Sequence, residues 1–165
     1  RHDEPAGIAL SRQNLTVSAS ATAAAEGVRR GAYVLAEAAD ADGQQTAPEV
    51  VLIATGSEVG VAVAARDILQ KEGTPTRVVS APCLEWFAQQ DAAYREQVLP
   101  AGTARVAIEA GIALGWREIV GDAGEIVSID HYGSSAPGTA LFEEYGFTGD
   151  NVAEWARRAL ARTRG

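Results

Sequence analysis

Short apolar runs recur along this chain and alternate with segments of helical periodicity. The runs at residues 50–54, 77–80, 105–108 and 125–129 are rich in β-branched side chains, as in strands that are covered on both faces. A shorter run at residues 31–36 resembles a further strand. Strands that alternate with helices predict an α/β fold, and we expect three layers, α/β/α, around a mostly parallel, five-stranded mixed sheet.

Helical periodicity is clearest after residue 58 and again after residue 151, and shorter helices are expected within residues 86–99 and 137–146. Each long segment presents one apolar stripe that would face the sheet. The stripes are Val61, Ala65, Ile68 and Leu69 in the first segment, and Val152, Trp155, Ala156, Ala159 and Leu160 in the second.

The start of the first long helix carries the sequence Thr55-Gly56-Ser57-Glu58. A turn at a helix amino terminus can bind phosphate, but this one has a single glycine, and Glu58 would repel an anion. Thr55 and Glu58 have the spacing of a capping box, with Ser57 as a rival cap. We therefore expect structural capping at this turn.

The first residues of the chain suggest a second domain. An apolar run at residues 7–10 predicts a buried strand, which delivers the polar side chains of residues 11–14 to its carboxyl end, where open α/β sheets bind ligands. Since the chain contains no methionine, we expect it to begin within a longer polypeptide. The expected division is a last strand of an otherwise missing domain at 1–16, an interdomain linker at 17–47 with at most one helical turn near its start, and an α/β domain at 48–165.

Composition narrows the possible partners. Lys and Arg number 14 against 22 Asp and Glu, a formal net charge of −8, which disfavours binding to nucleic acid or to an anionic membrane. The sequence has no apolar run long enough to span a membrane. A single cysteine, Cys83, excludes an internal disulfide and fits a reducing, cytoplasmic environment.

Conventional catalytic residues are sparse. Ser134, His131 and Asp130 could form a hydrolytic set, but neighbouring strand residues point to opposite faces, so Asp130 is badly placed to orient His131. Cys83 has the acidic Glu85 nearby, which disfavours a reactive thiolate. Two histidines and one cysteine do not have metal-ligand spacing, and Trp86, Trp116 and Trp155 are expected to be packing anchors.

Arg12 is the strongest candidate for binding chemistry. At the carboxyl end of a buried strand, between Ser11 and Gln13, its guanidinium could donate two hydrogen bonds to a phosphate or carboxylate. From spacing alone, an interdomain ion pair is an equal alternative.

An ordered set of short motifs resembles the end of transketolase, over residues 1 to about 160. The motifs are LSRQNL, GAYVL, IATGSEV, RVVSAPC, DAAYREQVLP, TARVAIEAG, GSSAP and LFEEYGFT. The segment Asp130-His131-Tyr132-Gly133 departs from the family, whose members tend to carry phenylalanine before the glycine, so His131 looks like a variable position.

The resemblance implies a cytoplasmic homodimer that uses thiamine diphosphate and a divalent cation, magnesium or calcium. Such an enzyme moves a two-carbon ketol unit from a ketose phosphate to an aldose phosphate in the pentose phosphate pathway. The arginine of the SRQN segment binds the substrate's phosphate in this family, which implies that role for Arg12. The catalytic, cofactor-binding and metal-binding residues of the family would lie outside this chain, so we expect the chain alone to be inactive and to expose an apolar patch where its partners dock.

Two alternatives remain. The chain could be a non-catalytic module whose glycine-rich strand ends bind a ligand or a partner. It could also be the tail of a related thiamine enzyme, such as dihydroxyacetone synthase or deoxyxylulose-phosphate synthase, although the GSEV, EAG and SAP blocks favour transketolase over the latter.

Overall fold

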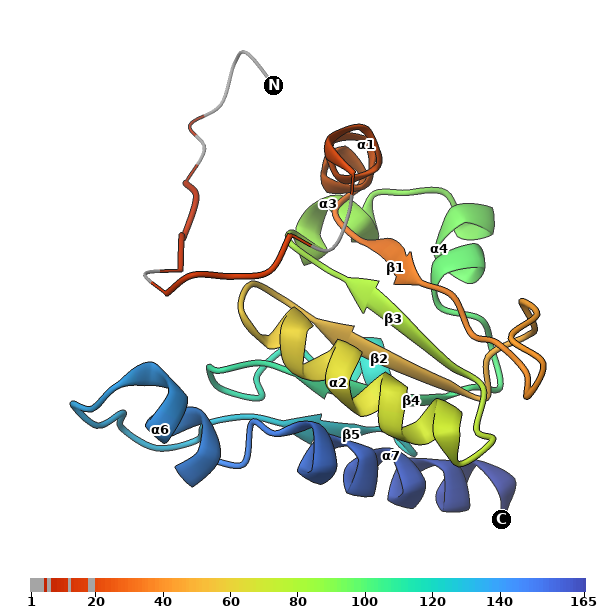
Figure 1. The fold of residues 1–165 in the computed structure, drawn as a ribbon. Helices are drawn as coiled ribbons and strands as arrows, with labels where there is room; N and C mark the ends of the chain where they lie inside the picture. The colour runs from red at the N-terminus through yellow and green to blue at the C-terminus, as the bar shows by residue number, and fades with distance from the viewer. Residues whose placement is uncertain (1–4, 6, 12, 18–19) are drawn as a thin grey trace.

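The computed structural model describes residues 5, 7–11, 13–17 and 20–165, and a five-stranded sheet lies at the centre of this part of the chain (Figure 1). Its order is β1-β3-β2-β4-β5, in which β2, β3, β4 and β5 are parallel and β1 pairs antiparallel with β3. This confirms the predicted mixed, mostly parallel sheet. The strands are β1 (Tyr33–Ala36), β2 (Val50–Ala54), β3 (Thr76–Ser80), β4 (Ala104–Ile108) and β5 (Glu125–Val127).

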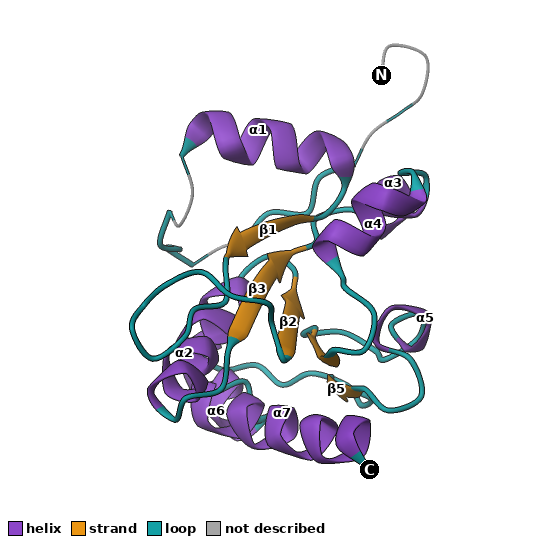
Figure 2. Cartoon of the chain, turned by 90° about the vertical axis from the view of Figure 1, so that its right-hand side faces the viewer, coloured by secondary structure: helices purple, strands orange, loops and turns teal. Residues whose placement is uncertain are grey.

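Helices cover both faces of the sheet, as Figures 1 and 2 show, so the predicted three-layer architecture is also confirmed. One layer contains α2 (Glu58–Lys71) and α7 (Gly149–Arg164), and the other contains α3 (Leu84–Ala88), α4 (Ala92–Val98) and α5 (Arg117–Val120). Two further helices are α1 (Ala21–Arg30), beside β1 and α3, and α6 (Gly138–Glu144), which precedes α7.

The central strand β2 shows why its sequence is apolar at every position. Successive side chains of a strand point to opposite faces of the sheet. Val50 and Leu52 therefore pack in the core beneath α2 and α7, whereas Val51 and Ile53 pack beneath α3, α4 and α5. A strand buried on both faces leaves no position for a polar side chain.

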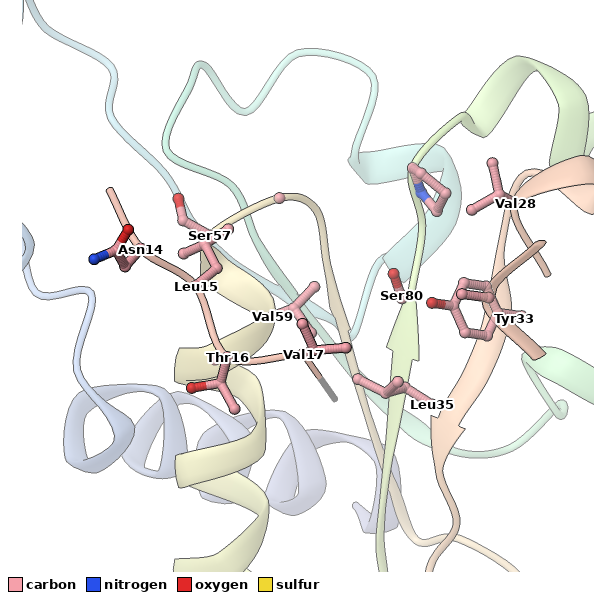
Figure 3. Close-up of a pocket in the computed structure, with 14 residues that line it drawn as sticks. Asn14, Leu15, Thr16, Val17, Val28, Tyr33, Leu35, Ser57, Val59 and Ser80 are labelled. Carbon is pink, nitrogen blue, oxygen red and sulfur yellow. The ribbon is translucent and has the colours of Figure 1, made fainter. Parts of the chain in front are cut away.

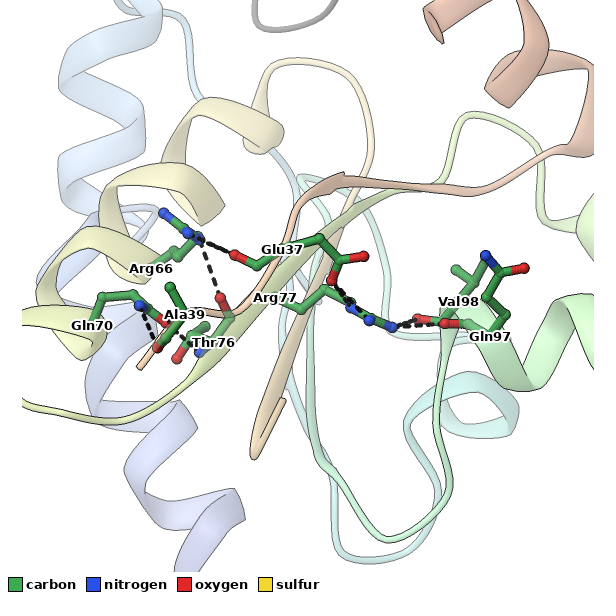
Figure 4. A network of polar contacts seen from close by, with 8 residues as sticks. All are labelled: Glu37, Ala39, Arg66, Gln70, Thr76, Arg77, Gln97 and Val98. Atoms are coloured by element: carbon green, nitrogen blue, oxygen red, sulfur yellow. Dashed lines mark hydrogen bonds and ion pairs between the residues drawn. The ribbon is translucent and has the colours of Figure 1, made fainter. Parts of the chain in front are cut away.

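The amino edge of the sheet is held by a network of polar side chains (Figure 4). Arg77, whose exposure is only 8%, donates to Oε2 of Glu37 and to the carbonyl oxygens of Gln97 and Val98. Arg66 donates to the carbonyl oxygens of Glu37 and Thr76. Gln70 donates to the carbonyl of Ala39 and accepts from the amide of Thr76. These contacts fasten the segment after β1 to the sheet.

Residues 17–47 contain more regular structure than a linker requires. Helix α1 has ten residues, where the sequence predicted at most one helical turn, and the hydroxyl of Ser20 accepts a hydrogen bond from the amide of Ala23 at its start. The following strand β1 lies at the edge of the sheet. Gly31 joins the two elements with φ +85°, and a Cβ at this position would overlap the backbone of Cys83 and Phe87. The segment thus packs closely on α3.

The strand predicted at residues 7–10 is not formed in this chain. This segment has no regular structure, and Ile8 and Leu10 are 81% and 86% exposed. A buried strand needs neighbouring strands and a covering layer, and none of the described strands pairs with these residues. The assignment of residues 1–16 to a second domain stays a prediction.

Candidate functional site at the carboxyl edge of the sheet

The carboxyl edge of the parallel strands has a switch point between β2 and β4. The connection that leaves β2 runs through α2 on one face of the sheet to β3, and the connection that leaves β4 runs through α5 on the other face to β5, on the opposite side. Open α/β sheets bind ligands in the crevice where the connections diverge in this way. Thr55 follows β2 and Glu109 follows β4, so both residues lie at this crevice.

Hydrogen bonds link the ends of these two strands. The Thr55 hydroxyl donates to Oε2 of Glu109 at 2.9 Å, and the amide of Ala110 donates to Oε1 of Glu58 at 2.7 Å. The Ser57 hydroxyl donates to the other Glu58 oxygen at 2.8 Å. The crevice is therefore closed by side chains of the protein itself.

The side-chain capping that the sequence predicts for the start of α2 is wrong, because the capping hydrogen bonds are not formed. Ser57 occupies the cap position with helical backbone angles, and its side chain makes no capping hydrogen bond. The side chains of Thr55 and Glu58 instead contact residues that follow β4. Tertiary folding here supplies other partners for these two side chains, the Glu109 carboxylate and the Ala110 amide, which both follow β4.

Two carboxylates make this crevice electrostatically unsuited to a phosphate. Glu58 is buried, and burial raises the pKa of the half-buried Glu109 carboxyl, with the Thr55 hydrogen bond opposing this rise and the nearby Glu58 charge adding to it. A diphosphate placed at the start of α2 would face both carboxyl groups. The crevice therefore does not fit thiamine diphosphate.

A cavity of about 490 Å³ lies beside the crevice, between residues 14–17 and the sheet (Figure 3). Tyr33 and Ser80 are directly opposite one another in the β1–β3 pair and both line it. Its other walls are mainly apolar and include Leu15, Val17, Val28, Leu35 and Val59. The cavity therefore marks the junction of the N-terminal segment with the domain.

The predicted phosphate ligand Arg12 lies outside the described residues. Its neighbours Ser11 and Gln13 are exposed. The assignment of a substrate phosphate to Arg12 therefore stays a prediction.

The structure does not assemble a hydrolytic set from Ser134, His131 and Asp130. Asp130 accepts hydrogen bonds from the amide of Ala113 and from the hydroxyl of Ser128. His131 Nδ1 lies 2.8 Å from the carbonyl oxygen of Tyr132, and its ring packs edge-on against Tyr145 at 4.9 Å. Ser134 is exposed. This agrees with the expectation that Asp130 does not orient His131.

The other candidates take part in local contacts. Cys83 Sγ lies 3.5 Å from Oε2 of Glu85. Trp116, the residue before α5, is buried in the core on the α3, α4 and α5 side of the sheet. Trp155 packs against the core on the α2 and α7 side, so both act as packing anchors, as expected. Trp86 is partly buried. Within the described residues, no group of three or more His, Cys, Asp or Glu side chains could hold a metal ion. No helix in the described part of the chain is long and apolar enough to cross a membrane.

Glu109 is the site residue that the sequence analysis missed. Its position directly after the apolar run of residues 105–108 could have indicated a carboxylate at the carboxyl edge. Its pairing with Thr55 could not be read from the sequence, because 54 positions separate the two residues.

The chain is therefore an α/β domain with a mostly parallel sheet. At the carboxyl edge of this sheet, the side chains of Glu58 and Glu109 close the switch point. A family model described as the transketolase-like TK C-terminal domain matches residues 31–148. The chain belongs to this family.

Individual transketolases are similar to this chain in sequence and in structure. A transketolase from Mycobacterium bovis is 54% identical over 159 residues, which cover 94% of this chain and 22% of that protein. A transketolase structure from Leishmania mexicana covers 85% of this chain and 19% of its own, with 36% identity and a TM-score of 0.75. A variant transketolase from Pichia stipitis, in complex with fructose-6-phosphate, covers 91% of this chain and 20% of its own, with 30% identity and a TM-score of 0.78. The chain thus spans about a fifth of the length of these relatives.

Proposed function

We propose that this chain is the carboxyl-terminal part of a transketolase. The complete enzyme would transfer a two-carbon ketol unit from a ketose phosphate to an aldose phosphate. The observation that carries the proposal is the 54% identity to a transketolase over almost all of this chain. The fructose-6-phosphate bound to the Pichia stipitis relative supports sugar phosphates as substrates.

Thiamine diphosphate and a divalent cation, magnesium or calcium, would supply the chemistry in the complete enzyme. The acidic switch point of this domain disfavours an anionic diphosphate, which supports a thiamine diphosphate site formed by residues outside this chain. The α/β domain would contribute structure and homodimer contacts, and Arg12 would bind the substrate's phosphate. The complete enzyme would work in the cytoplasm, in the pentose phosphate pathway.

The alternatives differ in the substrate or in the need for a cofactor. A related thiamine enzyme such as dihydroxyacetone synthase would share the cofactor and use another acceptor. A non-catalytic module would bind a ligand or a partner without any group transfer. The attached N-terminal segment favours transketolase over the non-catalytic module, and its SRQN motif favours transketolase over deoxyxylulose-phosphate synthase.

The test compares two purified proteins, the complete polypeptide that carries these residues and the chain of residues 1–165. Ketol transfer from fructose-6-phosphate to an aldose phosphate is measured with thiamine diphosphate and magnesium. We expect activity only in the complete polypeptide, and no saturable thiamine diphosphate binding by residues 1–165 in calorimetry. An inactive complete polypeptide, or micromolar cofactor binding by this chain, would contradict the proposal.

A further inference from the structure

Two hydroxyl groups face the cavity of about 490 Å³ that lies between residues 14–17 and the sheet. Tyr33 of β1 and Ser80 of β3 are directly paired, so their side chains lie on the same face of the sheet, toward α2 (Figure 3). Within the described part of the chain, neither hydroxyl forms a hydrogen bond, and neither is completely buried. Both hydroxyls are therefore available to a molecule in the cavity.

Helix α1 holds the Tyr33 ring in place. Gly27 of this helix is buried against the ring, and a Cβ at Gly27 would overlap the Cβ, Cγ and Cδ1 atoms of Tyr33. The ring therefore packs directly on the backbone of α1, where a residue larger than glycine would displace it. A hydroxyl that is positioned in this way before a ligand arrives loses less conformational entropy when the ligand binds.

The remaining walls of the cavity are uncharged. They include apolar side chains of the domain and of the N-terminal segment, and none of the described residues that line the cavity is charged. A phosphate or an ammonium group would find no oppositely charged side chain among these residues, and an unpaired charge is costly to remove from water. The lining therefore favours an uncharged occupant. The apolar side chains are Val28, Leu35 and Val59 of the domain and Leu15 and Val17 of the N-terminal segment.

The size and the composition of the cavity fit a small molecule. Ligand pockets in proteins measure roughly 300–1,000 Å³ and are mainly apolar, with a few polar groups that orient the ligand. Ser57, which also lines the cavity, already donates its hydroxyl to Glu58, and Asn14 and Thr16 line it from the exposed N-terminal segment. The orienting groups of the domain are thus the two hydroxyls on β1 and β3, each of which can donate or accept a hydrogen bond.

We propose that this cavity binds an uncharged small molecule that has an apolar ring and one hydroxyl or carbonyl group. The ring would lie against Leu35 and Val59, and the polar group would form hydrogen bonds with the hydroxyls of Tyr33 and Ser80. Sugar phosphates and thiamine diphosphate are anionic and do not fit this lining. The inference goes beyond the proposed function and does not depend on ketol transfer.

Fluorine NMR titrations of the complete polypeptide with three small probes test the proposal. We expect saturable binding of para-fluorophenol, and binding weaker by about two- to tenfold for para-fluorotoluene, which lacks the hydroxyl. Para-fluorophenyl phosphate should not bind at this site, because its charge would be unpaired. An absence of saturable para-fluorophenol binding would show that the complete polypeptide fills the cavity itself, and it would overturn the proposal.

Removal of single hydroxyls tests the two hydrogen bonds. Tyr33→Phe and Ser80→Ala should each weaken para-fluorophenol binding by about two- to tenfold and leave para-fluorotoluene binding unchanged. Tyr132→Phe, at a side chain that is 99% exposed and does not line the cavity, is the matched control and should change neither affinity. Equal para-fluorophenol affinity in all of these variants would contradict the proposal.

A second pair of variants tests whether the probe occupies this cavity. Gly60 of α2 lines the cavity and Gly138 of α6 does not, and both are exposed helical glycines at which a Cβ would meet open space. Gly60→Phe should abolish binding of both uncharged probes, and Gly138→Phe should leave it unchanged. Binding that persists in folded Gly60→Phe would overturn the proposal. If Gly60→Phe does not fold, the hydroxyl variants still decide.

Competition with fructose-6-phosphate separates this site from any site for a phosphorylated substrate. We expect no displacement of para-fluorophenol by the sugar phosphate, because the described lining has no cationic side chain. Displacement would place the probe at a phosphate-binding site and would overturn the proposal. Since every readout is binding, a complete polypeptide without ketol transfer would refute the proposed function and leave this site standing.

Discussion

The hydroxyl of Thr55 donates a 2.9 Å hydrogen bond to Oε2 of Glu109, and this bond joins the carboxyl ends of β2 and β4 at the switch point of the sheet. In many α/β proteins a ligand lies at this place. Here two side chains of the protein fill it, and the neighbouring Glu58 adds a second carboxylate. The crevice is thus an internal junction with a net negative charge.

Glu109→Gln should stabilise the domain at neutral pH. Burial raises the pKa of Glu109 in the folded state, so the folded protein binds this proton more tightly than the unfolded chain does. The resulting stabilisation is present at acidic pH and is lost as the pH rises through the folded-state pKa. The amide oxygen of glutamine can still accept from Thr55, and we expect a gain of at most about 1 kcal/mol, because the carboxyl is partly solvated.

Urea unfolding of residues 1–165 between pH 4 and pH 7.5 measures this effect. The stability difference between Glu109→Gln and the natural sequence should increase with pH and then reach a plateau. Glu143→Gln, at an exposed position of α6, is the matched control and should show no such trend. A difference that shrinks as the pH rises would contradict the assignment.

Arg77→Ala should destabilise the domain by roughly 1–3 kcal/mol, because it leaves two carbonyl oxygens without their donor. These are the carbonyls of Gln97 and Val98, while Glu37 is exposed enough to be hydrated. Arg77→Lys should recover part of the loss, since an ammonium group cannot reproduce the planar fork. Denaturant unfolding checks this, with Arg158→Ala as a surface control that should cost less than about 1 kcal/mol. Equal losses for the two alanine variants would show that the Arg77 contacts contribute little.

Gly31→Ala should be much more damaging than Gly43→Ala. Both glycines have positive φ, +85° and +76°, so both alanines carry a similar backbone strain of about 1 kcal/mol. A Cβ at Gly31 would also overlap the backbone of Cys83 and Phe87, whereas Gly43 faces open space. Thermal unfolding of the two variants isolates this close approach, and similar melting temperatures would mean that α1 does not pack on α3 as described.

Arg12→Ala in the complete enzyme should chiefly lower kcat/KM for phosphorylated substrates. Loss of one charge-assisted contact to a phosphate corresponds to about 1.5–3 kcal/mol in kcat/KM. The ratio of kcat/KM for a phosphorylated acceptor to that for an unphosphorylated acceptor separates this role from general damage. Gln13→Ala is the neighbouring control. An unchanged ratio in Arg12→Ala would remove the phosphate role from this residue.

The local sequence pattern was sufficient to predict secondary structure where all side chains of a segment share one environment. The apolar run at residues 50–54 forms the central strand because all of its side chains are buried, on either face of the sheet. The proline and glycine around residues 137–146 bound a short helix, as expected. Residues 7–10 have the same apolar character without regular structure, and none of the described strands pairs with them.

The sequence by itself determined the α/β class, the order of its main elements and the family, because these depend on periodicity and on ordered local motifs. Only the tertiary structure decided which side chains meet at the carboxyl edge. Thr55 could cap its own helix or bind Glu109, and the choice depends on a strand that lies 54 positions away in the chain. Contacts of this kind depend on how the strands are ordered in the sheet, which local pattern does not specify.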